Sequence, residues 1–173
     1  MSDDTDFDVL EKYFDELKAA PLVFADGLFK DQVVLVSGGA GGIGLAACVL
    51  FGRLGATVVS CSRDPEKMAW LDEALGKLDI SCFTHPMTIR DPEKVADLMA
   101  EVWDRYGRLD VLINNAGGQF AAPALEISPK GWNAVLDTNL SGSWYMSQAA
   151  ARQWTEHEQP GCVINVVAVL ETC

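Results

Sequence analysis

The segment whose residue types are best suited to bind a phosphate is a glycine-rich turn between an apolar strand and an apolar helix. Val33–Val36 are β-forming residues without polar alternation, which is typical of a central parallel strand covered on both faces. The strand leads into Ser37, Gly38, Gly39, Ala40, Gly41, Gly42, Ile43 and Gly44. Glycines permit a sharp turn and leave no Cβ where a phosphate approaches, and the helix predicted from Ile43 to Leu54 starts at the same place. The pattern predicts a binding site for a dinucleotide pyrophosphate.

The end of the next predicted strand, Val58–Cys61, is where the adenosine ribose of such a cofactor is expected. Ser62 and Arg63 follow it. A hydroxyl and a guanidinium suit the 2′-phosphate of NADP, whereas an acidic residue would accept a hydrogen bond from the 2′-hydroxyl of NAD. The sequence therefore favours NADP over NAD. The alternative role for Arg63 is that of a solvated arginine at the start of the next helix.

Two further segments place small or amide-bearing residues at a candidate site. The apolar run Leu109–Ile113 predicts a fourth strand that ends in NNAGG, residues 114–118. Small residues at the carboxyl end of a parallel strand let a flat nicotinamide ribose approach the backbone. The second segment, Asn139–Gly142, lies inside a helix predicted from Ser128 to about Glu156. Asn and Gly are poor residues for a helix interior, so we predict a local distortion there.

The elements that must position these residues alternate between strands and helices, which predicts an α/β fold with a Rossmann-like, doubly wound parallel sheet of about five strands. Ile80–Met87 predicts the third strand and Cys162–Val169 the fifth. Asp64 and Asp91, each followed by proline, predict the starts of two helices. The second of these helices carries an apolar stripe that we expect to be buried, formed by Val95, Leu98, Met99, Val102 and Tyr106.

An acidic extension, residues 1–28, precedes the predicted dinucleotide-binding domain at 29–173. Residues 1–31 carry nine acidic residues against three lysines, which is half of the net charge of −12. Phe7, Leu10, Phe14 and Leu17 fall on one face of a short amphipathic helix predicted over residues 7–18. We expect this helix to lie on the main domain or on another subunit, and a frayed acidic tail is the alternative.

Composition argues against several classes of function. The 173 residues, 49% of them hydrophobic, are enough for one folded soluble domain. The isoelectric point near 4.4 argues against nucleic acid and anionic membranes as partners. Neither a signal peptide nor an apolar run of membrane-spanning length is found, so we expect a cytoplasmic location. The five cysteines and two histidines lack metal-ligand spacing, so we expect buried or free thiols and no metal site.

From about residue 29 onward the chain resembles the classical short-chain dehydrogenases/reductases. The turn matches their TGxxxGIG motif with Ser37 in the Thr position, and NNAG and the NLSG segment beginning at Asn139 follow in order. The resemblance implies cofactor contacts from Ser37, Gly38, Gly39, Gly42, Ile43, Gly44, Ser62, Arg63, Thr88, Ile89, Asn115, Ala116 and Gly117. Thr88 departs from the family's usual Asp or Asn beside the adenine. Asn139 matches a catalytic residue of the family, which helps to order a water in the proton relay.

Within that family, residues 115–120 and 128–146 resemble the peroxisomal trans-2-enoyl-CoA reductases and the related 2,4-dienoyl-CoA reductases. Ala168 stands where most members carry a catalytic Ser, and these reductases also lack that Ser. The resemblance implies reduction of a double bond in an enoyl-CoA thioester by NADPH, with hydride passing to the β-carbon and a proton to the α-carbon. It also implies acyl-CoA contacts at Arg63, Arg90, Phe120 and Ser128, and arginines suit the phosphates of coenzyme A.

The family's catalytic Tyr-x-x-x-Lys is not in the sequence. In the family the Tyr donates the proton and the Lys lowers its pKa. Here the residues four positions after Tyr13, Tyr106 and Tyr145 are Leu17, Asp110 and Ala149. We therefore expect an N-terminal fragment of a longer reductase, inactive alone, with apolar surface exposed on its fifth strand. The full-length protein is expected to be a homo-oligomer.

Two other functions fit the same residues. One is a carbonyl or alcohol oxidoreductase of the same family, of the 3-oxoacyl reductase or alcohol dehydrogenase type, and substrate preference between thioesters and simple ketones would separate it. On that view the alanine at position 168 marks a degraded or inactive carbonyl reductase. The other is a non-catalytic nucleotide-binding or assembly module.

Overall fold

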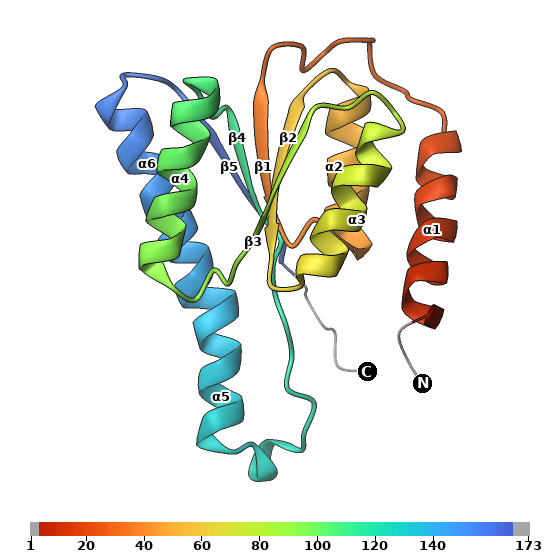
Figure 1. The fold of residues 1–173 in the computed structure, drawn as a ribbon. Coiled ribbons are helices and arrows are strands. Elements are labelled where there is room, and N and C mark those ends of the chain that lie inside the picture. The colour runs from red at the N-terminus through yellow and green to blue at the C-terminus, as the bar shows by residue number, and fades with distance from the viewer. Residues whose placement is uncertain (1–3, 168–173) are drawn as a thin grey trace.

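A parallel five-stranded sheet lies between two layers of helices in the computed structural model, which describes residues 4–167 (Figure 1). The strands are β1 (Val33–Ser37), β2 (Thr57–Ser62), β3 (Cys82–Pro86), β4 (Val111–Asn114) and β5 (Cys162–Asn165). Their order across the sheet is β3-β2-β1-β4-β5, and every adjacent pair is parallel. This confirms the predicted Rossmann-like α/β fold. The order of the strands reverses between β1 and β4, which is where such sheets bind ligands.

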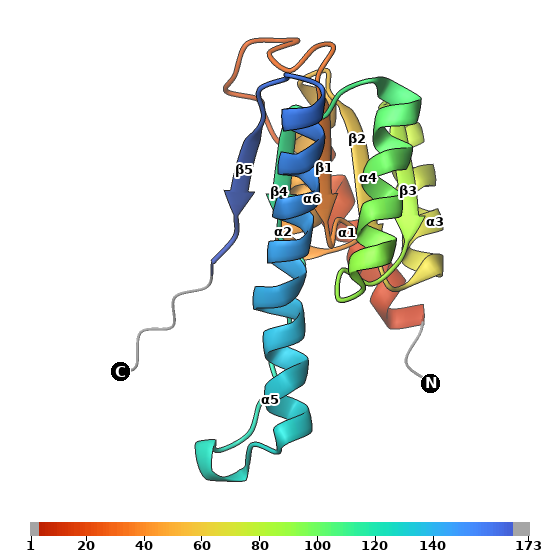
Figure 2. The same cartoon turned by 90° about the vertical axis from the view of Figure 1, so that its left-hand side faces the viewer.

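Helices from different parts of the chain cover the two faces of the sheet. They are α1 (Asp4–Ala19), α2 (Gly42–Arg53), α3 (Pro65–Gly76), α4 (Pro92–Tyr106), the 3₁₀ turn η1 (Ala124–Glu126), α5 (Pro129–Leu136), the π-helical segment η2 (Asp137–Gly142) and α6 (Ser143–Glu156). In Figures 1 and 2, α1, α2 and α3 lie on one face and α4 and α6 on the other. Neighbouring residues of β1 accordingly enter different cores, Val34 with α2 and Leu35 with α4.

Both helix starts predicted at an aspartate followed by proline are confirmed, and each aspartate caps its helix. The Oδ1 atom of Asp64 accepts hydrogen bonds from the first-turn amides of α3 at 3.0 and 3.1 Å, and Asp91 accepts from those of α4 at 3.1 and 3.3 Å. The predicted stripe of α4 is buried except for its last member. Tyr106, the final residue of the helix, is only partly buried, and Trp103 is buried instead, against the ring of His157 at a centroid distance of 4.4 Å.

The third and fifth strands are shorter than predicted. β3 starts at Cys82 and ends at Pro86, because these are the residues that pair with its neighbour β2. β5 pairs residue for residue with the four-residue β4 and therefore ends at Asn165. The last residues of the predicted strand, and the alanine at position 168, lie outside the described residues.

The amphipathic N-terminal helix is confirmed and packs on the domain. Leu10 and Phe14 are buried in the core shared with α2 and α3, while Phe7 and Leu17 are partly buried at its border. The Arg53 guanidinium in α2 also donates to the Leu17 carbonyl at 2.8 Å. Within residues 4–167, no helix has the length and apolar content needed to cross a bilayer.

The predicted exposure of the fifth strand is confirmed. β5 forms one edge of the sheet (Figure 2). All four of its residues are exposed. A groove of about 420 Å³ lined by Phe29, Phe51 and Ile164 lies beside it, and another of about 370 Å³ is lined by Trp144 and Val166. The covering helices of the described residues therefore leave both faces of this strand open.

Candidate functional site

A cavity of about 340 Å³ opens at the carboxyl ends of β1, β2, β3 and β4. Most of the predicted cofactor residues line it, although they come from four separate loops: Gly38, Gly42, Ser62, Arg63, Thr88, Ile89, Asn115, Ala116 and Gly117. Arg90 lines the same cavity. Ser37, Gly39 and Gly44 do not line this cavity, and Ile43 faces a second one nearby. The structure thus gathers residues far apart in the sequence around one concave surface.

The glycine turn has the local geometry that a phosphate requires. Gly38 and Gly42 adopt positive φ angles of 74° and 49°, a region that disfavours other residues. No described atom lies within 4 Å of a Cβ built on Gly42, so the start of α2 is open on that side. Gly41 precedes α2 without any side-chain cap among the described residues. An uncapped helix start leaves amide donors available for an anion, so the residues present fit a pyrophosphate.

Two glycines of the turn are required by close packing beneath it. A Cβ on Gly39 would lie 2.2 Å from the Ser60 hydroxyl, and a Cβ on Gly44 would lie 2.1 Å from the Gly38 carbonyl. Both distances are shorter than any real contact of a Cβ atom. Gly39 and Gly44 were predicted to contact the cofactor. In the structure they do not line the cavity, and they instead let the turn pack closely against the residues beneath it.

Ser37 and Asn115 tie the turn to the end of β4. The Ser37 hydroxyl is buried, donates to the Ile113 carbonyl at 3.4 Å, and accepts from the amides of Asn115 and Ala116 at 3.1 and 3.0 Å. The Asn115 side chain donates to the carbonyls of Ser37 and Gly38, both at 3.1 Å. A hydroxyl at position 37 therefore acts by joining two loops of the cavity.

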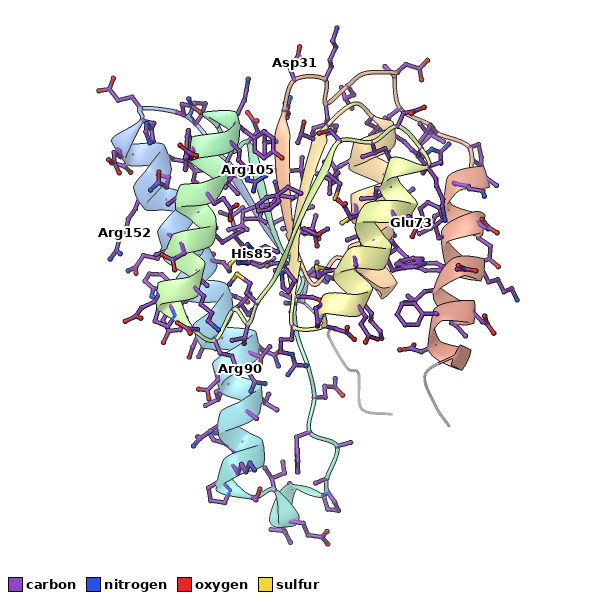
Figure 3. The ribbon with its side chains drawn as sticks, in the orientation of Figure 1. Asp31, Glu73, His85, Arg90, Arg105 and Arg152 are labelled. Atoms are coloured by element: carbon purple, nitrogen blue, oxygen red, sulfur yellow. The ribbon has the colours of Figure 1, made fainter. Side chains whose placement is uncertain are left out.

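Two arginines reach the cavity from neighbouring strand ends. Arg63 follows β2, is exposed, and forms no ion pair among residues 4–167. Arg90 lies below the sheet where the chain passes from β3 to α4 (Figure 3), and its Nε donates to the Thr138 hydroxyl at 2.6 Å. Thr138 in turn donates to the Ala134 carbonyl at 3.0 Å. The sequence interpretation missed Thr138, which immediately precedes the segment predicted to be distorted, Asn139–Gly142.

The predicted distortion of the long helix is confirmed as η2, which separates α5 from α6. Asn139 makes a reciprocal pair with the backbone of Gly118, accepting from its amide at 2.9 Å and donating to its carbonyl at 2.8 Å. Gly142 approaches Ile89 so closely that a Cβ there would lie 2.7 Å from the isoleucine. The π-helical segment is therefore held by the loops after β3 and β4, where π-helices commonly mark functional sites.

Asn139 lines the second cavity, of about 440 Å³, together with residues 114–119, Ile43, Ser143, Val166 and Val167. At its base the Asn114 amide donates to Ser147 and Asn165 at 2.9 Å each. The buried Oδ1 of Asn114 has no partner among the described residues. The sequence did not lead us to predict that Asn114 joins β4 to β5 and α6. The signal that could have indicated it is a polar residue at the end of an otherwise apolar strand.

Two of the predicted substrate residues lie elsewhere. Ser128 caps α5 by accepting from the Gly131 amide at 3.1 Å, and the Phe120 ring packs against Gly131. Neither residue lines either cavity. The structure therefore brings Arg63 and Arg90 together at one cavity and places Phe120 and Ser128 at the start of α5.

The four described cysteines are free thiols, and one of them, Cys82 on β3, is partly buried. Cys48 and Cys61 are fully buried, and burial raises the pKa of the Cys61 thiol to about 12 and that of Cys48 further. Cys162 on β5 is exposed. Cys173 lies outside the described residues. Within residues 4–167, no three histidine, cysteine or acidic side chains gather as metal ligands would.

The geometry agrees with comparisons to known proteins. A protein named a probable 2,4-dienoyl-CoA reductase from Bacillus subtilis (strain 168) is 34% identical over 139 residues, covering 79% of this chain and 54% of that protein. The peroxisomal 2,4-dienoyl-CoA reductase of Danio rerio is 30% identical over 152 residues, covering 86% of this chain and 49% of that protein. The chain thus spans about half the length of these curated relatives.

A solved structure shows the same likeness in space. The crystal structure of a metagenomic short-chain oxidoreductase in complex with NADP has a TM-score of 0.76 and 30% identity, covering 82% of this chain and 64% of that one. The family described as short chain dehydrogenase matches residues 32–172, which include every strand and both cavities. On this match and the geometry above, the chain belongs to the short-chain dehydrogenase family.

Proposed function

We propose that this chain is the cofactor-binding part of an NADPH-dependent reductase that acts on the double bond of an enoyl-CoA thioester. The observation that carries the proposal is the pair of arginines, Arg63 and Arg90, at one cavity beside an uncapped helix start. Both the 2′-phosphate of NADPH and the phosphates of coenzyme A favour guanidinium partners. The similarity to two 2,4-dienoyl-CoA reductases supports this substrate class.

The residues of the turn and of β2 divide the work of binding. The open backbone around Gly42 would receive the pyrophosphate, and Ser62 and Arg63 would hold the 2′-phosphate at the end of β2. The small residues Ala116 and Gly117 would leave room for the nicotinamide ribose. When bound, the reduced nicotinamide supplies hydride. The chain's own residues bind and orient it.

Asn139 acts in this proposal by fixing the loop after β4. Its reciprocal pair with Gly118 holds the backbone that lines the second cavity, and its amide keeps one N–H and one lone pair free to order a water. The proton of the reaction must come from another group, because no tyrosine of the sequence is followed by lysine four residues later. The 173-residue chain alone is therefore expected to bind cofactor without turnover.

Fluorescence titration with NADPH and NADH tests the cofactor part of the proposal. Arg63→Ala should weaken NADPH binding about 10- to 100-fold, the effect of losing a hydrogen bond to a charged group, and leave NADH binding unchanged. Arg152→Ala is the matched control, because Arg152 is an exposed arginine on the outer side of α6 (Figure 3) and lines neither cavity. Equal affinity of the parent chain for both cofactors, or binding of neither, would contradict the proposal.

Calorimetry in the presence of NADPH tests the substrate part. Arg90→Ala should weaken binding of a trans-2-enoyl-CoA and leave binding of the corresponding enoyl-pantetheine thioester unchanged, because the latter lacks the nucleotide phosphates. Equal losses for both ligands would show that Arg90 acts only through the fold. A parent chain that binds a simple ketone in preference to either thioester would favour a carbonyl reductase instead.

A further inference from the structure

The N-terminal helix α1 contacts the turn that forms the proposed cofactor site. Leu10 is only 8% exposed, and its Cδ2 lies 3.7 Å from the position of a Cβ on Gly41. Gly41 also lines the 340 Å³ cavity. Leu10 also lies in the same buried core as Ala40 and Leu45, the residues on either side of Gly41 to Gly44. The turn therefore borders α1 on one side and the cavity on the other. The helix itself precedes residues 32–172, the part that the family match covers.

Several contacts hold α1 against the two helices that flank the site. The Phe14 ring meets Trp70 of α3 edge to face, with a centroid distance of 6.0 Å. The Arg53 guanidinium of α2 donates to the Leu17 carbonyl at 2.8 Å. Asp6 forms an ion pair with Lys67 in the first turn of α3, four residues after Arg63. The helix is therefore attached to α2 and α3, two of the elements that begin at the cavity.

The middle of the turn, Gly41 and Gly42, has fewer contacts than its two ends, where Gly39 and Gly44 are closely packed. Gly41 precedes α2 in an extended conformation with φ near 174° and no side-chain cap among the described residues. Gly42 has no described atom within 4 Å of its Cβ position. Glycine backbones lose the most conformational freedom on ordering, so an external contact that holds this turn lowers the entropy lost when a ligand binds.

We propose that α1 is a positioning element for the cofactor turn, and that Leu10 acts by holding Gly41 and the start of α2 in their binding conformation. The inference rests on the proposed cofactor site, and it concerns a segment outside the family match. Leu10 touches the turn and not the cofactor, so it is a positioning residue. Weakening the contact should lower cofactor affinity by making the turn mobile, with the fold intact.

Substitution of Leu10 in the whole 173-residue chain tests this inference with two measurements. Leu10→Ala should weaken NADPH binding about tenfold, a usual size for coupling between two sites. The same variant should speed amide hydrogen exchange at residues 40–45. Val9→Ala, at a neighbouring position that is 65% exposed, should change neither measurement. Leu10→Met should restore both, and Leu10→Val replaces the alanine variant if that variant does not fold.

A control for general destabilisation is Val102→Ala, a fully buried valine of α4 on the opposite face of the sheet. It should lower the melting temperature and leave NADPH affinity and exchange at the turn unchanged. The inference is overturned if Val102→Ala weakens NADPH binding as much as Leu10→Ala, or if Leu10→Ala behaves like Val9→Ala. A parent chain that binds no NADPH contradicts the proposed function, and exchange at residues 40–45 then decides the role of α1.

Discussion

Strands β1 and β5 both pair in parallel with β4, but β1 is buried and β5 is exposed to solvent. All five residues of β1 are buried, whereas all four residues of β5 are exposed. The strands differ in their neighbours. β1 has a strand on each side and helices over both faces, whereas within residues 4–167 β5 has a partner strand on one side only. Hydrogen bonding therefore places a strand in a sheet, while helices and further strands determine how deeply it is buried.

The two cavities differ in the same way, because one lies among buried strands and the other borders the exposed strand β5. The cavity with Arg63 and Arg90 lies at the ends of strands β1 to β4 and at the start of α2. The second cavity is completed by Val166 and Val167, which follow the exposed β5, and Val167 is itself 73% exposed. The part of the site proposed to hold the adenosine end of the cofactor thus lies among the buried strands, which we call the closed flank. The part proposed to hold the nicotinamide end borders β5, which we call the open flank.

Thiol labelling should give the largest contrast between the flanks. At pH 8, iodoacetamide should alkylate Cys162 at least about 1000-fold faster than Cys61, because the buried thiol reacts only when the core opens. The pKa of Cys61, raised to about 12 by burial, also keeps its thiol protonated. Peptide mass spectrometry over time measures both rates. Concentrated guanidinium chloride should remove the difference, and equal rates in native buffer would show that the β1 flank is open too.

The buried Cys61 thiol also predicts how the free energy of unfolding depends on pH. A folded-state pKa raised above the unfolded value means that the folded chain binds the proton more tightly. The contribution of Cys61 to the free energy of unfolding is complete below the ordinary thiol pKa and is lost as pH rises through the alkaline range toward about 12.

A methyl group added at the closely packed end of the glycine turn should have the next largest effect, on both the free energy of unfolding and NADPH binding. Gly44→Ala would place a Cβ 2.1 Å from the Gly38 carbonyl, so the turn must move. We expect a loss of about 3 kcal/mol in the free energy of unfolding, and no measurable NADPH binding. Urea unfolding and cofactor titration measure the two effects.

The matched control for that change is Gly76→Ala at the end of α3, where no atom lies within 4 Å of the Cβ position. Alanine is the better helix residue, so stability should rise by up to about 1 kcal/mol. Wild-type affinity for NADPH in Gly44→Ala would show that the turn yields without cost to the site.

The smallest contrast comes from one pair of isoleucines that face each other in register on β4 and β5. Ile113 is 4% exposed and Ile164 is 40% exposed. Ile113→Ala should lower the free energy of unfolding by about 2 kcal/mol more than Ile164→Ala, because only the first leaves a cavity in a closed core. Equal losses in urea unfolding would mean that another part of the protein, or a second copy, covers β5 in solution.

Local patterns predicted the order of the elements well. The apolar runs gave β1, β2 and β4, and the aspartate–proline pairs marked the starts of α3 and α4. The poor helix residues Asn139 and Gly142 correctly indicated a break, which is the π-helical segment. Each of these signals acts within a few residues, so it can be recognised from the order of residues alone. The length of β5 was overestimated because its end is set by the length of its partner, β4.

The sequence by itself determined the kind of fold and the chemistry of the turn, since periodicity, caps and glycines act locally. Only the tertiary structure decided which polar groups meet: Arg90 with Thr138, Asn139 with Gly118, and Asn114 with Asn165. It also chose between a docked α1 and a frayed tail, through the burial of Leu10 against a turn some 30 positions away. Such contacts join residues distant in the chain, and parallel strands bring them to one edge only after the whole sheet has formed.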